Sequence, residues 1–121
     1  MYPKASPGRN PHLLEMARGM CCLLKSPVCD NDTDTVVAAH SNQARHGKGL
    51  SRKASDVFTV HCCGACHHWL DQGKDATKVQ KIAAFTLAHV RQVALWNQIA
   101  VDPREKPADR RTAQWAIDEL L

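Results

Sequence analysis

The chain has 121 residues and a formal net charge of +4 at pH 7, and only 5% of its residues are aromatic. This length fits one domain with a thin apolar core, so we expect an additional cross-link, such as a bound metal ion, to stabilise the fold. No apolar run has the length of a bilayer span or of a secretion signal, so we expect a cytoplasmic protein without a membrane partner. In that compartment six cysteines favour metal ligation; in a secreted chain they would indicate a disulfide scaffold.

The chain divides into three parts. Residues 1–20 contain three prolines and two glycines, which predict a basic, partly flexible arm with one helical turn over His12–Arg18. Residues 21–74 hold all six cysteines and form the expected metal module. Residues 75–121 are expected to be two supporting helices.

Two short strands are predicted inside the metal module. Thr35–His40 is rich in β-branched residues and ends in His40, and Val57–Val60 is a second run of this kind. The strands can pair as an antiparallel hairpin with a long connection. From Thr35 to Ser55 there is no acidic residue. We expect this basic connection to contact a phosphate backbone, the alternative being a merely solvated loop. Its candidate contacts are Arg45, His46, Lys48, Arg52 and Lys53.

Helical patterns follow the second strand. One runs from Cys66 to a stop at Gly73, and a longer one runs from about Asp75 to Ala100. Pro107 then fits the first position of a last helix. The long helix is predicted to bury a stripe at three-to-four spacing: Val79, Ile82, Thr86, Val90, Val93, Trp96 and Ala100.

The cysteine spacing predicts a tetrahedral zinc site. Two thiols separated by two residues can hold one ion from a tight turn, and a second pair upstream completes the set. The expected ligands are Cys22, Cys29, Cys63 and Cys66. Three substitutes stay open: Cys21 for Cys22, Cys62 for Cys63, and His61 for one thiol.

The same stretch also matches a c-type haem attachment signature, Cys63-x-x-Cys66-His67. Haem attachment of this kind needs export and leaves Cys22 and Cys29 unexplained. We therefore expect no haem.

Four stretches of the chain resemble the HNH nucleases, the ββα-metal or His-Me finger family. The closest likeness is to phage-encoded nuclease-like proteins of the Ref type, named for recombination enhancement and dependence on RecA. The stretches are Cys22–Cys29, Val37–Asn42, His46–Gly49 and Cys63–Gly73, within about residues 20–75. The resemblance implies an α+β fold, in which a small zinc-stapled ββα-metal module is followed by C-terminal helices.

The resemblance also implies a function, which is phosphodiester hydrolysis on DNA. His40 takes the family's role of general base, and His67 takes that of a ligand to a catalytic Mg²⁺ or Mn²⁺ ion. The four thiolates would hold a separate, structural zinc. A phage or prophage origin and a partner in recombination, such as a recombinase, are implied in the same way.

The sequence departs from the family pattern at two positions. Ala39 stands where the family commonly has an acidic metal ligand, and Phe58 falls near the expected middle asparagine. Asp71 offers a replacement ligand, because it lies four residues after His67 and residues at this spacing share a helix face. The alternative is that Asp71 is an ordinary acidic residue on the helix surface. Asp56 is another candidate. Two non-catalytic functions stay open, a zinc-stapled nucleic-acid-binding protein and a protein-interaction zinc module.

Overall fold

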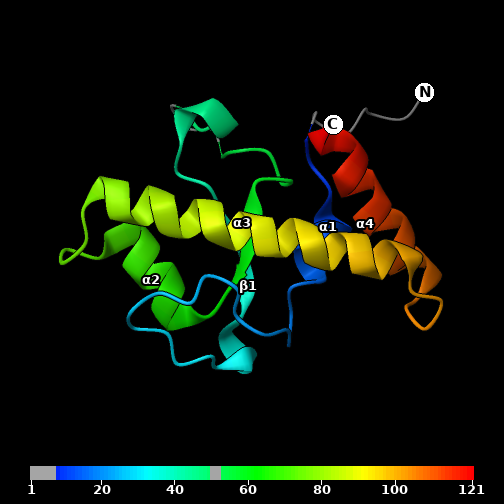
Figure 1. Cartoon of the computed structure of the whole chain (residues 1–121), viewed down its shortest axis with the longest axis horizontal. Coiled ribbons are helices and arrows are strands. Elements are labelled where there is room, and N and C mark those ends of the chain that lie inside the picture. The colour runs from blue at the N-terminus through cyan, green and yellow to red at the C-terminus, as the bar shows by residue number, and fades with distance from the viewer. Residues whose placement is uncertain (1–7, 50–52) are drawn as a thin grey trace.

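The structure is a computed structural model that describes residues 8–49 and 53–121. Within these residues the chain forms an α+β fold with one antiparallel two-stranded sheet, which confirms the expected class (Figure 1). The helices and strands are α1 (Pro11–Glu15), β1 (Val37–His40), β2 (Thr59–Cys62), α2 (Gly64–Gln72), α3 (Lys78–Val101) and α4 (Pro107–Leu120). Two short 3-10 turns, η1 (Thr33–Thr35) and η2 (Ala44–His46), lie before and after β1.

The two strands begin later than the sequence predicts. Thr35 belongs to η1 because its hydroxyl donates to the Asp32 carbonyl at 2.8 Å, which closes a turn instead of extending a strand. The second strand begins at Thr59, after a turn at Asp56. The register pairs Val37 with Cys62 and His40 with Thr59. All of β2 is buried, and the strand leads directly into Cys63 at the start of α2.

The helix ends follow local chemistry. The α2 helix ends at Gly73, where an added Cβ would lie 2.5 Å from the Trp69 carbonyl oxygen. Thr77 and Gln80 form a capping box that starts α3. Pro107 occupies the first turn of α4, as predicted.

The α3 helix buries a face different from the predicted stripe. Its buried residues are Phe85, Ala88, Gln92, Trp96 and Ile99. Trp96 is shared with that stripe, and Val93 and Ala100 of the stripe are partly buried against the second core. Val79 and Val90 are 75% and 64% exposed, which contradicts the prediction for both. Apolar residues occupy two opposite faces of this helix, and spacing alone does not say which face turns inward.

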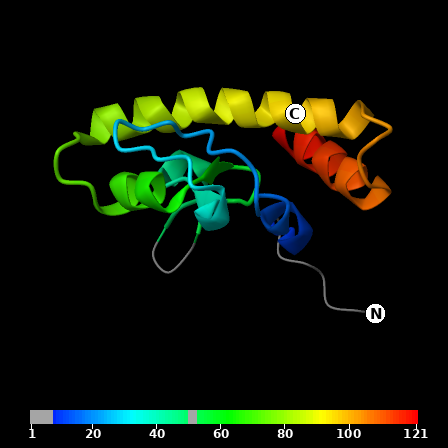
Figure 2. The same cartoon turned by 90° about the horizontal axis from the view of Figure 1, so that it is seen from below.

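Figure 2 shows α3 along one side of the molecule, with the other elements on the opposite side. One core lies between the cysteines, the sheet, α2 and the first half of α3, and it includes Val60, Leu70 and Phe85. A second core joins α1, α4 and the last half of α3 around Leu13 and Trp96. Among the described residues, no helix has both the length and the apolar character to cross a membrane.

Candidate functional site

Four cysteine sulfurs meet where β2 enters α2. The sulfur atoms of Cys22, Cys29, Cys63 and Cys66 all lie within 4.8 Å of one another. The Sγ atoms of Cys29 and Cys63 are 3.9 Å apart. Sulfurs bound to one tetrahedral zinc at about 2.3 Å lie about 3.8 Å apart. The donor set and its spacing therefore fit a metal ion such as zinc.

The protonation of these thiols also fits a cation site. Burial opposes ionisation of Cys22, but hydrogen bonds from backbone groups of Lys25, Cys63 and Leu24 and from the Cys66 thiol lower its pKa to about 7. Burial raises the pKa of Cys29 and of Cys66. Close sulfurs of this kind resist taking on several negative charges together, and a bound divalent cation removes that resistance.

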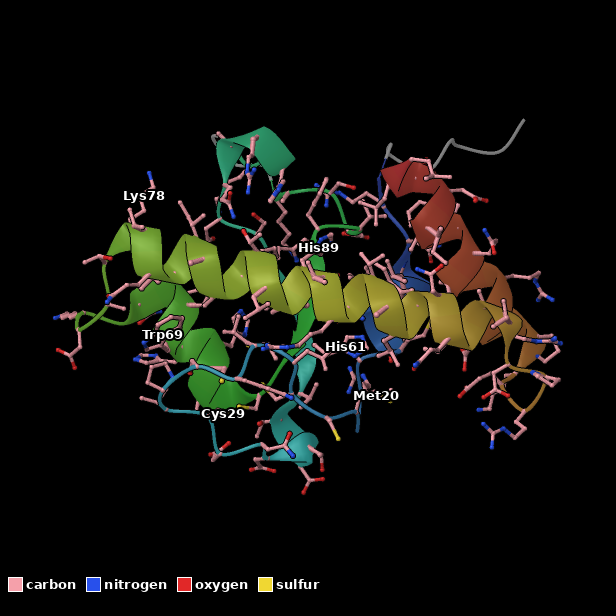
Figure 3. The ribbon with its side chains drawn as sticks, viewed as in Figure 1. Met20, Cys29, His61, Trp69, Lys78 and His89 are labelled. Carbon is pink, nitrogen blue, oxygen red and sulfur yellow. The ribbon has the colours of Figure 1, made fainter. Side chains whose placement is uncertain are left out.

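The three open substitutes lie outside this cluster. Cys21 is exposed, and Cys62 is buried within β2. The Nε2 atom of His61 lies 3.2 Å from the side-chain nitrogen of Gln92 on α3, and burial lowers the pKa of His61 to about 4. Figure 3 shows His61 and Cys29 well apart beneath α3. The sulfur cluster is therefore made by the four preferred cysteines.

His40, at the end of β1, is paired with a buried aspartate. Its Nε2 lies 2.8 Å from Oδ1 of Asp56, whose side chain is 3% exposed. The guanidinium of Arg9 contacts the same oxygen at 3.1 Å, and the backbone N–H of Asn10 donates to Oδ2 at 2.7 Å. Arg9 also donates to the carbonyls of Lys53 and Ala54. Asp56 is thus held from three sides and is not a free cation ligand.

His67, on the first half of α2, is paired with an accessible aspartate. Its Nε2 lies 3.1 Å from Oδ2 of Asp71, and the two side chains are 38% and 40% exposed. The other oxygen of Asp71 accepts a hydrogen bond of 2.8 Å from the side-chain amide of Asn42. This imidazole and carboxylate face solvent together, as the spacing of four residues predicts.

The chain links the two histidine–aspartate pairs in two ways. His67 directly follows the cluster residue Cys66, and His40 ends the strand that pairs with β2, which leads into Cys63. Asn42 lies two residues after His40 and binds Asp71 directly. Asn42 therefore ties the segment just after β1 to the last turn of α2.

The described residues of the basic connection make defined contacts. His46 stacks on Phe58 with ring centroids 4.1 Å apart, and its Nδ1 lies 2.7 Å from the Ser41 hydroxyl. Burial lowers the pKa of His46, which favours the neutral form of its ring. Arg45, Lys48 and Lys53 are exposed, whereas Arg52 lies outside the described residues.

Sequence reasoning missed Arg9, Asn10 and Asn42. Asn10 caps α1 ahead of Pro11, a local signal that the sequence does contain. The Arg9–Asp56 contact joins residues 47 positions apart and has no local signal. From the sequence alone, Asp56 is a candidate only for a cation ligand.

Comparison with known proteins places this chain in a family. The family model described as "Putative nuclease YbcO" matches residues 11–101, about three quarters of the chain. That range includes the sulfur cluster and both histidine–aspartate pairs. No curated protein and no solved structure matches the chain. The chain therefore belongs to the YbcO family, whose description indicates a nuclease acting on nucleic acid.

Proposed function

We propose that this protein is a DNA endonuclease of the HNH type that hydrolyses phosphodiester bonds with a divalent cation. The observation that carries this proposal is the presence of two histidine–aspartate contacts, with Asn42, two residues after His40, bound to the aspartate of the second contact. One contact is buried at His40 and the other is accessible at His67. Membership of a nuclease family supports the reaction class.

In this proposal His40 is the general base. When Nε2 donates its proton to the Asp56 carboxylate, Nδ1 is left with the lone pair that can accept a proton from water. Arg9 and the Asn10 N–H hold the carboxylate in place, so the imidazole keeps one orientation. Asp56 therefore acts through His40 as a positioning residue.

His67 and Asp71 would hold the catalytic cation, Mg²⁺ or Mn²⁺. One carboxylate and one imidazole on an open helix face leave room for water and a phosphate oxygen, a combination that Mg²⁺ accepts. The bound ion would neutralise charge that builds on the phosphate during cleavage. Arg45, Lys48, Arg52 and Lys53 would contact neighbouring phosphates, with affinity that falls as salt rises.

The four cysteines would hold a structural zinc, separate from the catalytic ion. All four donors are sulfur, and a closed set of four thiolates is typical of structural rather than catalytic zinc. A phage or prophage origin and a recombinase partner stay predictions from the resemblance alone.

The decisive experiment is a cleavage assay with supercoiled plasmid and single-stranded circles in Mg²⁺ or Mn²⁺. His40→Ala should lower the cleavage rate about 10²- to 10⁴-fold, because a general base is lost. His67→Ala should remove the response to the cation. His68→Ala is the matched control, since His68 is exposed and lies next to His67 on the same helix. Equal activity of His40→Ala and wild type would contradict the proposal.

A second function is favoured by one observation. Ala39 has a buried methyl side chain, 1% exposed, where the family commonly has an acidic ligand. A zinc-stapled protein that binds nucleic acid without cutting it would need no such ligand. Salt-sensitive DNA binding by wild type, with no cleavage in either cation, would establish this second function.

A further inference from the structure

A half-open pocket lies beside the accessible histidine–aspartate pair, between the segment after β1, α2 and the first half of α3. Its apolar lining comes from Leu70, Ile82 and Phe85, and its polar lining includes Asn42, Gln43 and Lys78. Leu70 and Phe85 are buried, whereas Asn42 and Lys78 are exposed. The pocket therefore has an apolar floor and a polar rim, as sites for small organic groups commonly do.

The pocket adjoins the aspartate of the accessible pair in two ways. Asn42 lines the pocket and also donates to Oδ1 of Asp71 at 2.8 Å. Leu70, on the floor, directly precedes Asp71 in α2. A group seated in the pocket would thus lie next to whatever His67 and Asp71 bind.

The charge of the pocket favours a nucleotide. Two lysines line it, Lys78 and Lys81, and among the described residues no carboxylate does. Lys81 is held by a 2.7 Å hydrogen bond to the Gly73 carbonyl, whereas Lys78 is exposed at the first turn of α3 (Figure 3). A cation at the rim suits a phosphate, and an apolar floor suits the ring of a base.

The two amides at the rim can contact the polar edge of a base. The amide nitrogen of Asn42 is used on Asp71, so its oxygen is the group that it can offer as an acceptor. The Oε1 atom of Gln43 accepts from Nε of Arg45 at 2.6 Å, so its amide nitrogen is left as a donor. Base edges present donors and acceptors side by side, and amide side chains pair with both.

We propose that this pocket holds an unpaired base next to the phosphate that is cleaved, so that the substrate is DNA with single-stranded bases at the cut. The inference rests on the proposed function, because it places the base beside a cation held by His67 and Asp71. A base in a duplex must leave its stack before it can enter a pocket, and an unpaired base avoids that cost. Single-stranded or gapped DNA should therefore be cut faster than intact duplex.

The test compares cleavage of a single-stranded oligonucleotide with cleavage of the same sequence as a duplex, in Mg²⁺ or Mn²⁺. Wild type should have a kcat/KM about 10-fold higher or more on the single strand, since no base pair is opened. Ile82→Trp, which fills the pocket, should lower single-strand cleavage to the duplex rate. Leu87→Trp is the matched control and should keep the preference, because Leu87 is 56% exposed on the same helix and outside the pocket lining.

A second variant does not depend on repacking. Lys78→Ala should weaken binding of the single strand more than binding of the duplex, measured by fluorescence anisotropy without added Mg²⁺. The slope of log affinity against log salt on the single strand should fall by about 0.7, as for the loss of one phosphate contact. Lys74→Ala, an exposed lysine outside this pocket, should keep the wild-type slope.

The outcomes separate this inference from the proposed function. Wild type that cuts both substrates equally fast, or a folded Ile82→Trp variant that keeps the preference, would contradict the pocket assignment and leave the nuclease proposal standing. Wild type that binds single strands through Lys78 but cuts no DNA would contradict the nuclease proposal and support the pocket. If circular dichroism shows that Ile82→Trp is misfolded, Lys78→Ala decides, and an unchanged salt slope overturns the inference.

Discussion

His40 and His67 each face an aspartate, yet the two pairs have opposite surroundings. Asp56 is buried and contacted by Arg9 and Asn10, so it can orient an imidazole but has no free side for an ion. Asp71 is accessible and is contacted by a neutral amide. The same two residue types can therefore serve as a base with its orienting partner in one place and as cation ligands in the other. In the proposed function, burial and the neighbouring charge decide which role each pair takes.

The largest expected effect comes from disrupting the metal site formed by the sulfur cluster. Cys66→Ser, or a strong chelator, should unfold much of residues 21–74, because structural zinc supplies on the order of 10 kcal/mol of folding free energy. Circular dichroism and elemental analysis measure the loss of structure and of metal.

Cys21→Ser is the control for this change, because Cys21 is exposed and lies outside the sulfur cluster. Purified wild type that contains no transition metal and is stably folded would contradict the zinc assignment.

The next effect separates the two pairs directly. At saturating Mg²⁺, Asp56→Asn should lower the cleavage rate about 10²-fold or more, since the amide can turn His40 to the wrong tautomer. Asp71→Asn should instead raise the Mg²⁺ concentration needed for half-maximal cleavage about 10- to 100-fold. Rates measured across a Mg²⁺ titration distinguish these results.

Asp75→Asn, an exposed substitution just beyond α2, should change neither quantity. If the Asp56 and Asp71 variants showed the same defect, the two pairs would not have different roles.

The last effect concerns stability and not cleavage, and it arises from His61, a buried histidine with no carboxylate partner among the described residues. Its pKa is lowered by burial from 6.5 to about 4, so the folded chain takes up its proton later than the unfolded chain as pH falls. The free energy of unfolding should therefore decrease by about 3 kcal/mol between pH 6.5 and 4, and no further from this group below pH 4.

Urea unfolding across this pH range measures the effect. His61→Gln should weaken the acid dependence, whereas His68→Gln, an exposed control, should leave it unchanged. An equal slope for wild type and His61→Gln would show that another group dominates acid sensitivity.

Local spacing predicted the parts of the structure that depend on local contacts. The Cys63-x-x-Cys66 turn, the stop at Gly73, the start at Pro107 and the shared face of His67 and Asp71 all follow from residues a few positions apart. Both strands begin two residues later than predicted, because the hydroxyls of Thr35 and Thr59 donate to carbonyls three residues earlier and close turns there, whereas β1 still ends at His40 as predicted. Such competition between turn and strand is decided by tertiary pairing.

Contacts between distant segments could not be predicted in this way. The buried face of α3 depends on what packs beneath it, and a helix with two apolar faces is ambiguous by periodicity. The Arg9–Asp56 contact requires the chain to return across 47 positions. No local pattern encodes that return, so the orienting partner of His40 was found only in the structure.

The position of Arg9 has a practical consequence for how this protein is made. A shortened version starting at Pro11 would keep every residue that the family model matches, yet it would remove both the cation and the backbone donor that neutralise Asp56. Of the contacts described above, the buried carboxylate of Asp56 would then keep only the imidazole of His40. Burying a charge with so few partners lowers the stability of the fold. Affinity tags are therefore better fused after Leu121, whose side chain is 98% exposed, than placed close to Arg9.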